Sequence, residues 1–254
     1  MFVLLIGVID GIPELRWQGQ EGAFYISVVE RLGSDLESLF VFCGERFSVK
    51  TVLLLADRML QIVQYIHRKG WIYRDFRPDN LLMGQRNRKN NLFVANFQLA
   101  KRYTDRKSGI HIPYAEDKGM VGTARYASMN CQRGLEMSRR DDMESIGYML
   151  LYFLRGKLPW QGLDAKTAEK RNARILSRKE ATSPSLLCAN FPGFQPYFDH
   201  VFALEFTDEP DYHYLRTIFR KMYVGAGYAQ LEDNVEFDWN ILRGNADDPR
   251  IVDW

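Results

Sequence analysis

Two long stretches of the sequence repeat apolar residues at helical spacing, and they constrain the fold more than any other feature. Residues 48–70 begin on a serine that can cap a helix, continue with apolar side chains every three or four positions, and end on a glycine. Residues 138–156 follow the same plan, and Ser138 and Asp141 have the spacing of a capping box. We therefore expect two buried core helices, against which the rest of the chain must pack.

The other segments predict short strands and further helices. Apolar and polar residues alternate over residues 24–28, and a polar loop at 85–91 separates two short apolar segments as in a hairpin. A charged, loop-like region covers residues 102–122. No repeat or linker divides the chain, so we expect one mostly helical domain, with further helices at 165–177, 195–206 and 211–224.

Composition narrows the class of protein and of partner. The chain has 254 residues, 46% of them apolar, which is ample for a core. Its 34 basic and 32 acidic residues leave a formal charge of +2, which predicts neither nucleic acid nor membrane as a partner, so any basic site must be local. The three widely separated cysteines suit neither a disulfide framework nor a metal clip. A reducing compartment, cytoplasmic or nuclear, is therefore expected.

The first nine residues are apolar but lack the features of a secretion signal. No basic region precedes them and no cleavage site of small residues follows before Trp17. Nowhere does an uncharged run approach the roughly 20 residues that a membrane span needs. We expect residues 1–9 to form a strand or the end of an upstream element.

The segment 73–80, YRDFRPDN, carries the clearest chemistry. It places the carboxylate of Asp75 and the carboxamide of Asn80 five positions apart, in a loop that follows a long helix. This spacing is similar to that of the kinase catalytic loop, in which the Asp accepts the proton of the substrate hydroxyl and the Asn holds a magnesium ion. Taken alone, the segment also fits a Pro-Asp turn with a charged capping loop.

Further motifs make the resemblance specific: the chain resembles the casein kinase 1 family of Ser/Thr protein kinases. The similarity extends from about Gly11 to Leu242 and includes a Ser-Met-Asn sequence at 128–130, where most kinases have Ala-Pro-Glu. It implies an α+β, protein-kinase-like fold, consisting mainly of the helical large lobe with a remnant of the small β-lobe. The motifs are YRDFRPDNLLMG (73–84), LAKRYTD (99–105), HIPY (111–114), GTARYASMN (122–130), SRRDDMESIGYMLLYF (138–153), LPWQG (158–162) and FDWNIL (237–242).

The resemblance implies roles for individual residues. ATP and Mg²⁺ are the family's cofactors, and the backbone around Glu30 and Leu32 matches the hinge that contacts adenine. Leu82 matches the apolar floor under the base. Asp75 matches the catalytic base, and Arg77 stands where the family has a lysine near the transferred phosphate. The acid that ties down the catalytic loop is matched by Asp142 in the second core helix.

The chain departs from the family at the metal site. Asn80 and Asn96 match the two metal ligands, but Asn96-Phe97-Gln98 stands where the family has Asp-Phe-Gly. A neutral amide thus replaces the carboxylate that bridges magnesium to the phosphates, and magnesium prefers charged oxygen. Gln98 also replaces a glycine that would give the loop freedom at positive φ.

A second departure concerns the residues before the hinge. Kinases cover the ATP phosphates with a Gly-x-Gly-x-x-Gly loop and pair them with a lysine on the third strand. Residues 1–30 contain no lysine and no such loop, so both features lack counterparts in this sequence. We therefore expect the apolar surface around Val29, Leu82, Ala95 and Phe97 to be exposed or covered by residues 1–20.

The resemblance also implies an anion site that reads phosphorylated substrates. Its residues are matched by Arg125, Lys118 and Gly156, but Asp164 stands where a lysine is expected and would repel phosphate. Lys157 could compensate, so both anion binding and an ordinary cluster of surface ion pairs remain open.

Two hypotheses follow for one truncated kinase domain, with residues 1–30 as the remnant of the small lobe and 31–254 as the helical large lobe. The first is a catalytically impaired kinase-like domain that acts as a binding module, with proteins as its partners. The alternative is an active Ser/Thr kinase that transfers the γ-phosphate of ATP to acidic or pre-phosphorylated proteins. We favour the first, because the change at Asn96 removes a metal ligand.

Overall fold

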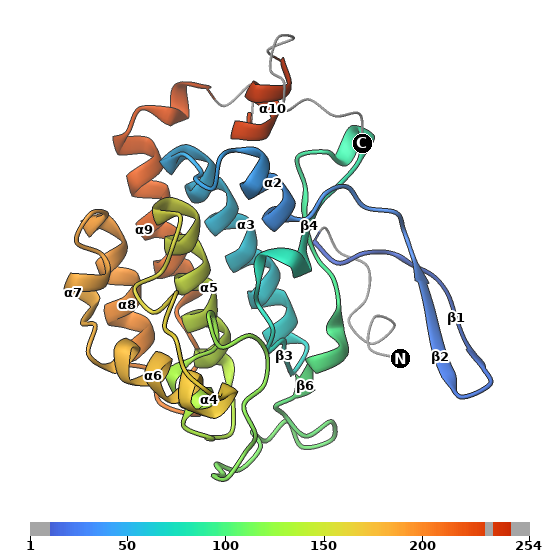
Figure 1. The fold of residues 1–254 in the computed structure, drawn as a ribbon. Coiled ribbons are helices and arrows are strands. Elements are labelled where there is room, and N and C mark those ends of the chain that lie inside the picture. Colours follow the sequence, from blue (N-terminus) through green and yellow to red (C-terminus); the bar gives the residue numbers. More distant parts are fainter. Residues whose placement is uncertain (1–10, 232–235, 245–254) are drawn as a thin grey trace.

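The computed structural model describes residues 11–231 and 236–244. The prediction of a strand at residues 1–9 lies outside these ranges. Helices make up most of the body, and the strands form three separate antiparallel pairs (Figure 1). The helices are α2 (Leu36–Phe42), α3 (Val49–Arg68), α4 (Met129–Gln132), α5 (Arg139–Arg155), α6 (Ala168–Glu180), α7 (Pro184–Leu187), α8 (Gln195–Phe202), α9 (Tyr212–Gly225) and α10 (Asp238–Gly244).

The strand pairs are short and lie at different places along the chain. The first is a hairpin of β1 (Leu15–Glu21) and β2 (Phe24–Val29). The second joins β3 (Trp71–Ile72) to β6 (Lys101–Arg102). The third joins β4 (Leu81–Met83) to β5 (Leu92–Val94), which confirms the predicted hairpin around the polar loop at 85–91.

The two predicted core helices are confirmed. The Ser48 hydroxyl accepts a hydrogen bond from the Thr51 amide at the start of α3, and the Asp141 carboxylate accepts one from the Ser138 amide, at 2.7 Å, at the start of α5. Both helices end before a glycine with positive φ, Gly70 at +78° and Gly156 at +82°. A residue with a Cβ would adopt this backbone conformation only at a cost in energy. Helix α5 is buried on nearly every side, as its sequence predicted.

One main core joins these helices to the rest of the body. Helix α3 packs against α5 and α9, and α5 packs against α8. The largest buried side chains in it are aromatic and come from segments far apart in sequence: Phe40, Phe47, Tyr73, Phe76, Tyr148, Phe153, Trp160, Phe194, Tyr197, Phe198 and Phe219. Such packing holds the loop after α3 on a rigid support.

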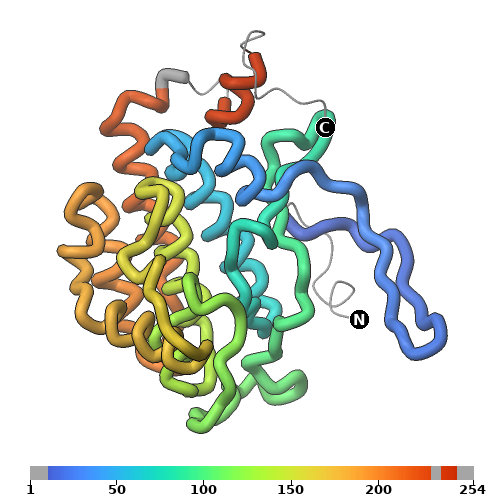
Figure 2. Tube along the Cα trace, in the orientation of Figure 1, coloured from blue at the N-terminus to red at the C-terminus, as the bar shows by residue number. Residues whose placement is uncertain are grey.

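The hairpin of β1 and β2 contrasts with this body. It projects from the helices and meets them only at its base (Figure 2). Several of its apolar side chains are in solvent, with Phe24 75% and Tyr25 81% exposed, whereas Leu15 and Ile26 are half-buried. A two-stranded hairpin is marginally stable by itself, because one face of a sheet normally needs a packing partner.

Several predicted boundaries shift. The helix expected at 165–177 is α6 at Ala168–Glu180, because the Thr167 hydroxyl caps it. The helix expected at 195–206 already ends at Phe202. Among the described residues, no helix has an apolar stretch of the length required to cross a bilayer.

Candidate active site

The loop at 73–80 is anchored from behind by one buried carboxylate. Asp142, in the first turn of α5, accepts hydrogen bonds from the amides of Tyr73 and Arg74, both at 2.7 Å. The His67 ring nitrogen Nε2 lies 2.9 Å from the same carboxylate. This confirms the tethering role expected for Asp142.

His67 links this anchor to the far side of α3. Its Nδ1 lies 2.7 Å from the Tyr212 hydroxyl, so a neutral ring with its proton on Nε2 donates to Asp142 and accepts from the tyrosine. Burial lowers the pKa of His67, although the hydrogen bond to Asp142 acts in the opposite direction. The ring is therefore neutral near pH 7 and forms part of the scaffold.

Asp75 and Asn80 lie together as their spacing predicted. The Asn80 amide nitrogen donates to the Asp75 carboxylate at 2.7 Å and to the Asp75 backbone carbonyl at 3.0 Å. Burial raises the pKa of Asp75, while the hydrogen bond from Asn80 and the charge of Arg77 lower it. The Asn80 amide thus holds the Asp75 carboxylate in one orientation. Because an amide group does not accept a proton near neutral pH, it does not compete with the carboxylate as a base.

Asn96 extends this pair into a chain of amides. Its Nδ2 donates to the Asn80 side-chain oxygen at 3.2 Å. The residue has a φ of +54°, a conformation that asparagine tolerates better than most residues, and it precedes the short 3₁₀ turn Phe97–Leu99. Hydrogen bonds therefore run from Asn96 through Asn80 to Asp75.

This donor set does not fit the magnesium site of the family. One carboxylate, Asp75, faces two carboxamides, and the Asn80 oxygen already accepts the Asn96 N–H. Magnesium prefers charged oxygen ligands and requires near-ideal octahedral geometry. Within residues 11–231 and 236–244, no three His, Cys, Asp or Glu side chains form a group that could hold a metal ion. We derive no chemical step through bound MgATP.

Arg77 lies at the front of the same loop. Its Nε donates to Asp79 at 3.1 Å and its terminal nitrogen donates to the Thr123 hydroxyl at 3.2 Å. The guanidinium thus connects the loop at 73–80 to the segment that follows Gly122. Gly122 itself has a φ of +78°, and a Cβ there would lie 2.9 Å from the Arg74 carbonyl oxygen, so the close approach requires glycine.

The predicted hinge residues lie between the hairpin and α2. The Glu30 amide donates to the Glu14 carbonyl, and the Leu32 carbonyl accepts from the Gln85 side chain. In the described part of the chain, the Glu30 carbonyl and the Leu32 amide have no hydrogen-bond partner. One acceptor and one donor thus remain open on this segment, and adenine contacts here stay a prediction.

The apolar surface next to the hinge is partly open. Val29 is 40% exposed, whereas Leu82, Ala95 and Phe97 are half-buried. Leu82 is the middle residue of β4 and pairs with Phe93. The alternative that residues 1–20 cover this surface is not decided, because residues 1–10 lie outside the described ranges.

The three residues predicted for an anion site have different neighbours. The Arg125 guanidinium lies 5.3 Å from the centre of the Tyr152 ring, one turn before Gly156 in α5. Lys118, by contrast, lies 3.9 Å from the Glu136 carboxylate. These contacts do not bring the three residues together, and anion binding by them stays a prediction.

A buried lysine was missed from the sequence. The Lys179 ammonium donates to the carbonyls of Ala124 and Ala127, at 2.9 and 2.5 Å, and so fixes the segment beside the catalytic loop. Burial lowers the pKa of Lys179 and raises that of Glu144, which accepts from the Tyr148 hydroxyl. In the sequence, Lys179 stands only at the end of a segment with helical periodicity. That pattern does not distinguish a buried lysine from a solvated one.

The family comparison agrees with this geometry. The family model of the protein kinase domain matches residues 20–192, which contain the hinge, the loop at 73–80 and α5. The helical body with its small antiparallel strand pairs is the α+β, kinase-like fold that the sequence predicted, with a helical large lobe and a small strand remnant. The chain belongs to the protein kinase domain family.

Proposed function

We propose that this chain is a casein kinase 1-like domain without useful phosphoryl transfer, which acts as a protein-binding module. The observation that carries the proposal is the hydrogen bond from the Asn96 amide to the Asn80 oxygen. It places an N–H donor where the family uses a carboxylate. A donor there disfavours a cation, and phosphoryl transfer depends on magnesium to neutralise the phosphates.

The amide chain also gives the loop an internal support that needs no metal. Asn80 is 6% exposed and donates twice to Asp75, and Asn96 orients it from the other side. In a catalytic domain the ion would link these two segments. Here hydrogen bonds between neutral groups take over that structural task, which supports a role in binding.

We propose one domain, with residues 1–30 as a small-lobe remnant and 31–254 as the helical large lobe. Two further features support a module that binds proteins in a reducing compartment. The hairpin exposes Trp17, Phe24 and Tyr25, and aromatic side chains are common at protein interfaces. Cys131 and Cys188 are free thiols, in keeping with a cytoplasmic or nuclear location.

An active Ser/Thr kinase is the second candidate, and the preserved back of the catalytic loop favours it. Asp142 holds the loop at Tyr73 and Arg74, and burial raises the pKa of Asp75 towards that of a useful base. Under this candidate Asp75 would accept the proton of the substrate hydroxyl, and Arg77 would lie near the transferred phosphate.

A phosphoryl-transfer assay separates the two candidates. The 254-residue chain is incubated with γ-labelled ATP, magnesium and casein, beside an Asp75→Asn variant as the matched control. We expect both proteins to label casein equally, at the background level. Labelling by the unmodified chain that falls at least tenfold in Asp75→Asn would overturn the proposal in favour of the active kinase.

A further inference from the structure

A cavity of about 660 Å³ lies outside the catalytic loop. Its walls come from the segment 31–35, the start of α2, the loop 83–89 and α10. Neither Asp75 nor the two asparagines beside it line this cavity. Leu32, whose backbone is predicted to contact adenine, is also in its wall, so the cavity adjoins the predicted hinge but not the loop at 73–80.

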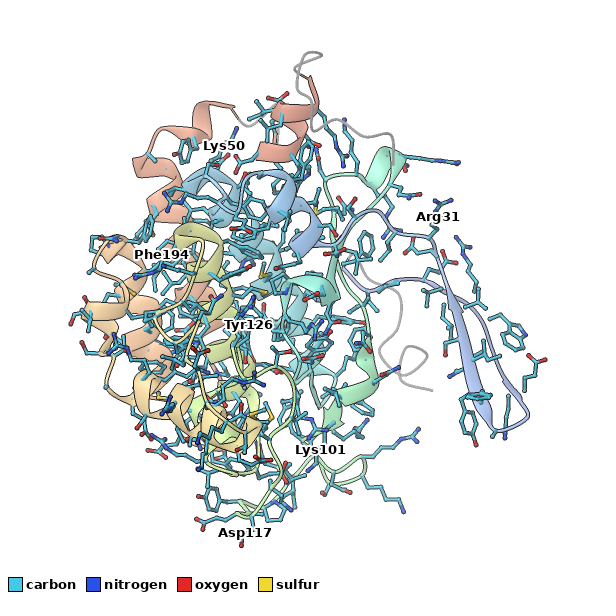
Figure 3. All side chains as sticks on the ribbon, in the orientation of Figure 1. Arg31, Lys50, Lys101, Asp117, Tyr126 and Phe194 are labelled. Atoms are coloured by element: carbon cyan, nitrogen blue, oxygen red, sulfur yellow. The ribbon has the colours of Figure 1, made fainter. Side chains whose placement is uncertain are left out.

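Positive charge gathers around the cavity from three separate segments. Arg31 comes from the segment before α2, Arg86 and Lys89 come from the loop between β4 and β5, and Arg243 comes from α10. Figure 3 labels Arg31 near the base of the hairpin. Four cations thus surround one space, although the net charge of the whole chain is only +2.

One carboxylate opposes them. Asp35 also lines the cavity, but its two oxygens already accept from the amide and the hydroxyl of Ser38, at 2.8 and 2.7 Å. These bonds belong to its role as the cap of α2. The net charge of the side chains that line the cavity is therefore positive: four are cationic, and the one carboxylate already accepts two hydrogen bonds.

The four cations form no ion pair with the described residues, and all four are exposed. The Arg243 guanidinium lies over the Phe42 ring, 5.8 Å from its centre, and keeps its charge exposed there. Their neighbour Arg88 behaves differently, because it forms an ion pair with Glu30 at 2.9 Å. Unpaired like charges repel one another, and a bound anion would remove that repulsion.

The backbone of Arg86 is an independent sign of function. Its φ is +53°, a left-handed conformation that glycine adopts without cost and that costs another residue about 1–2 kcal/mol. The chain thus keeps a long cationic side chain at a position where the backbone favours glycine. Strain of this kind collects at functional sites.

We propose that this cavity binds a compact ligand that carries several phosphate groups. Its volume lies within the range of small-molecule sites. Arginine matches phosphate with a planar pair of N–H donors, and cations on three segments can contact different phosphates at once. Buried Leu39, Met83 and Trp239 form an apolar floor that strengthens these contacts.

A single-stranded nucleic acid fits the cavity less well. Such strands bind by stacking their bases on exposed aromatic side chains. Trp239 is the one aromatic residue among the described residues that line the cavity, and it is 2% exposed. The size and the charge therefore favour a compact polyphosphate.

Calorimetric titration of the 254-residue chain with myo-inositol hexakisphosphate, at physiological salt, tests the proposal. We expect saturable binding at one site, weakened roughly ten- to a hundredfold in the double variant Arg86→Gln/Arg243→Gln. The charge-matched control Lys170→Gln/Arg171→Gln changes two exposed cations of α6, and its affinity should stay within about twofold of the parent.

A glycine variant separates lost binding from lost folding. Arg86→Gly removes the guanidinium and also relieves the backbone, so we expect weaker binding together with an equal or higher urea midpoint. A purely structural role for Arg86 predicts the reverse, with a lower midpoint and unchanged affinity, and would overturn the assignment.

Further outcomes decide between sources of the ligand. Binding of vesicles with inositol-phosphate headgroups, with weaker binding of the free compound, would assign the same phosphate chemistry to a lipid headgroup. Absence of saturation below 1 mM, or equal weakening in the α6 control, would overturn the proposal. So would tighter binding of a single-stranded oligonucleotide that depends on Arg86 and Arg243.

Discussion

The two sides of the catalytic loop differ in chemistry. At the back, the buried carboxylate of Asp142 accepts two backbone N–H bonds and contacts His67, so a charge is fully used to hold the loop. At the front, Asn96 and Asn80 meet through neutral amides, and the contact is longer, at 3.2 Å. The contacts at the back hold the loop in its fold. Under the proposed function, the front has no metal ion to hold.

Asp142 supports the loop with a carboxylate, whereas Asn96 and Asn80 meet at the front as an amide donor and an amide acceptor. The proposed binding module needs the support at the back and does not need a metal ion at the front.

Removing the rear anchor should have the largest effect. Asp142→Ala leaves two backbone N–H groups and the His67 ring without their acceptor, which should lower the free energy of unfolding by about 3–5 kcal/mol. Urea unfolding measures this, with Asp199→Ala, an exposed acid in α8, as the control that should change by less than about 0.5 kcal/mol. A loss for Asp142→Ala no larger than the control would contradict the anchoring role.

The same anchor predicts a pH dependence of stability. Since the folded state lowers the pKa of His67 below the unfolded value of 6.5, its contribution is complete above that pH and is lost as the pH falls through it. The loss is at most about 1.4 kcal/mol per pH unit. Urea unfolding at several pH values between 7.5 and 5 should therefore show a steeper decline for the parent than for His67→Gln. Parallel profiles would refute this.

A change at the front should cost less. Asn80→Ala removes two hydrogen bonds to Asp75, one of them to its carboxylate, and should destabilise the fold by about 1–2 kcal/mol. Asn96→Gly removes one longer bond at an exposed position without straining the left-handed backbone, and should cost less than about 1 kcal/mol. If Asn96→Gly costs more than Asn80→Ala, the order of the amide chain is wrong.

Much of the fold followed from helical periodicity and capping. Ser48 and Ser138 fixed the starts of α3 and α5 because a cap is a local interaction that the sequence displays. Boundaries such as the end of α8 were less accurate, since they depend on packing between distant segments. The short α2 and α7 have too few residues for a periodic pattern.

The candidate site was predictable only where its members are close in sequence or match a motif. The contact of Asp75 with Asn80 is local, and the place of Asp142 followed from the resemblance. The hydrogen bond between Asn96 and Asn80 joins two segments, and its direction depends on the left-handed backbone of Asn96. The burial of Lys179 and the gathering of Arg31, Arg86 and Arg243 likewise depend on tertiary structure.

Thermal unfolding of the 254-residue chain with ATP, in magnesium or in EDTA, tests most directly whether the amide pair excludes the metal. We expect magnesium not to raise the unfolding temperature above its value in EDTA, up to millimolar ATP. A magnesium-dependent rise that saturates with ATP would contradict it, because binding at a hundredfold excess over Kd stabilises the fold by about 2.7 kcal/mol.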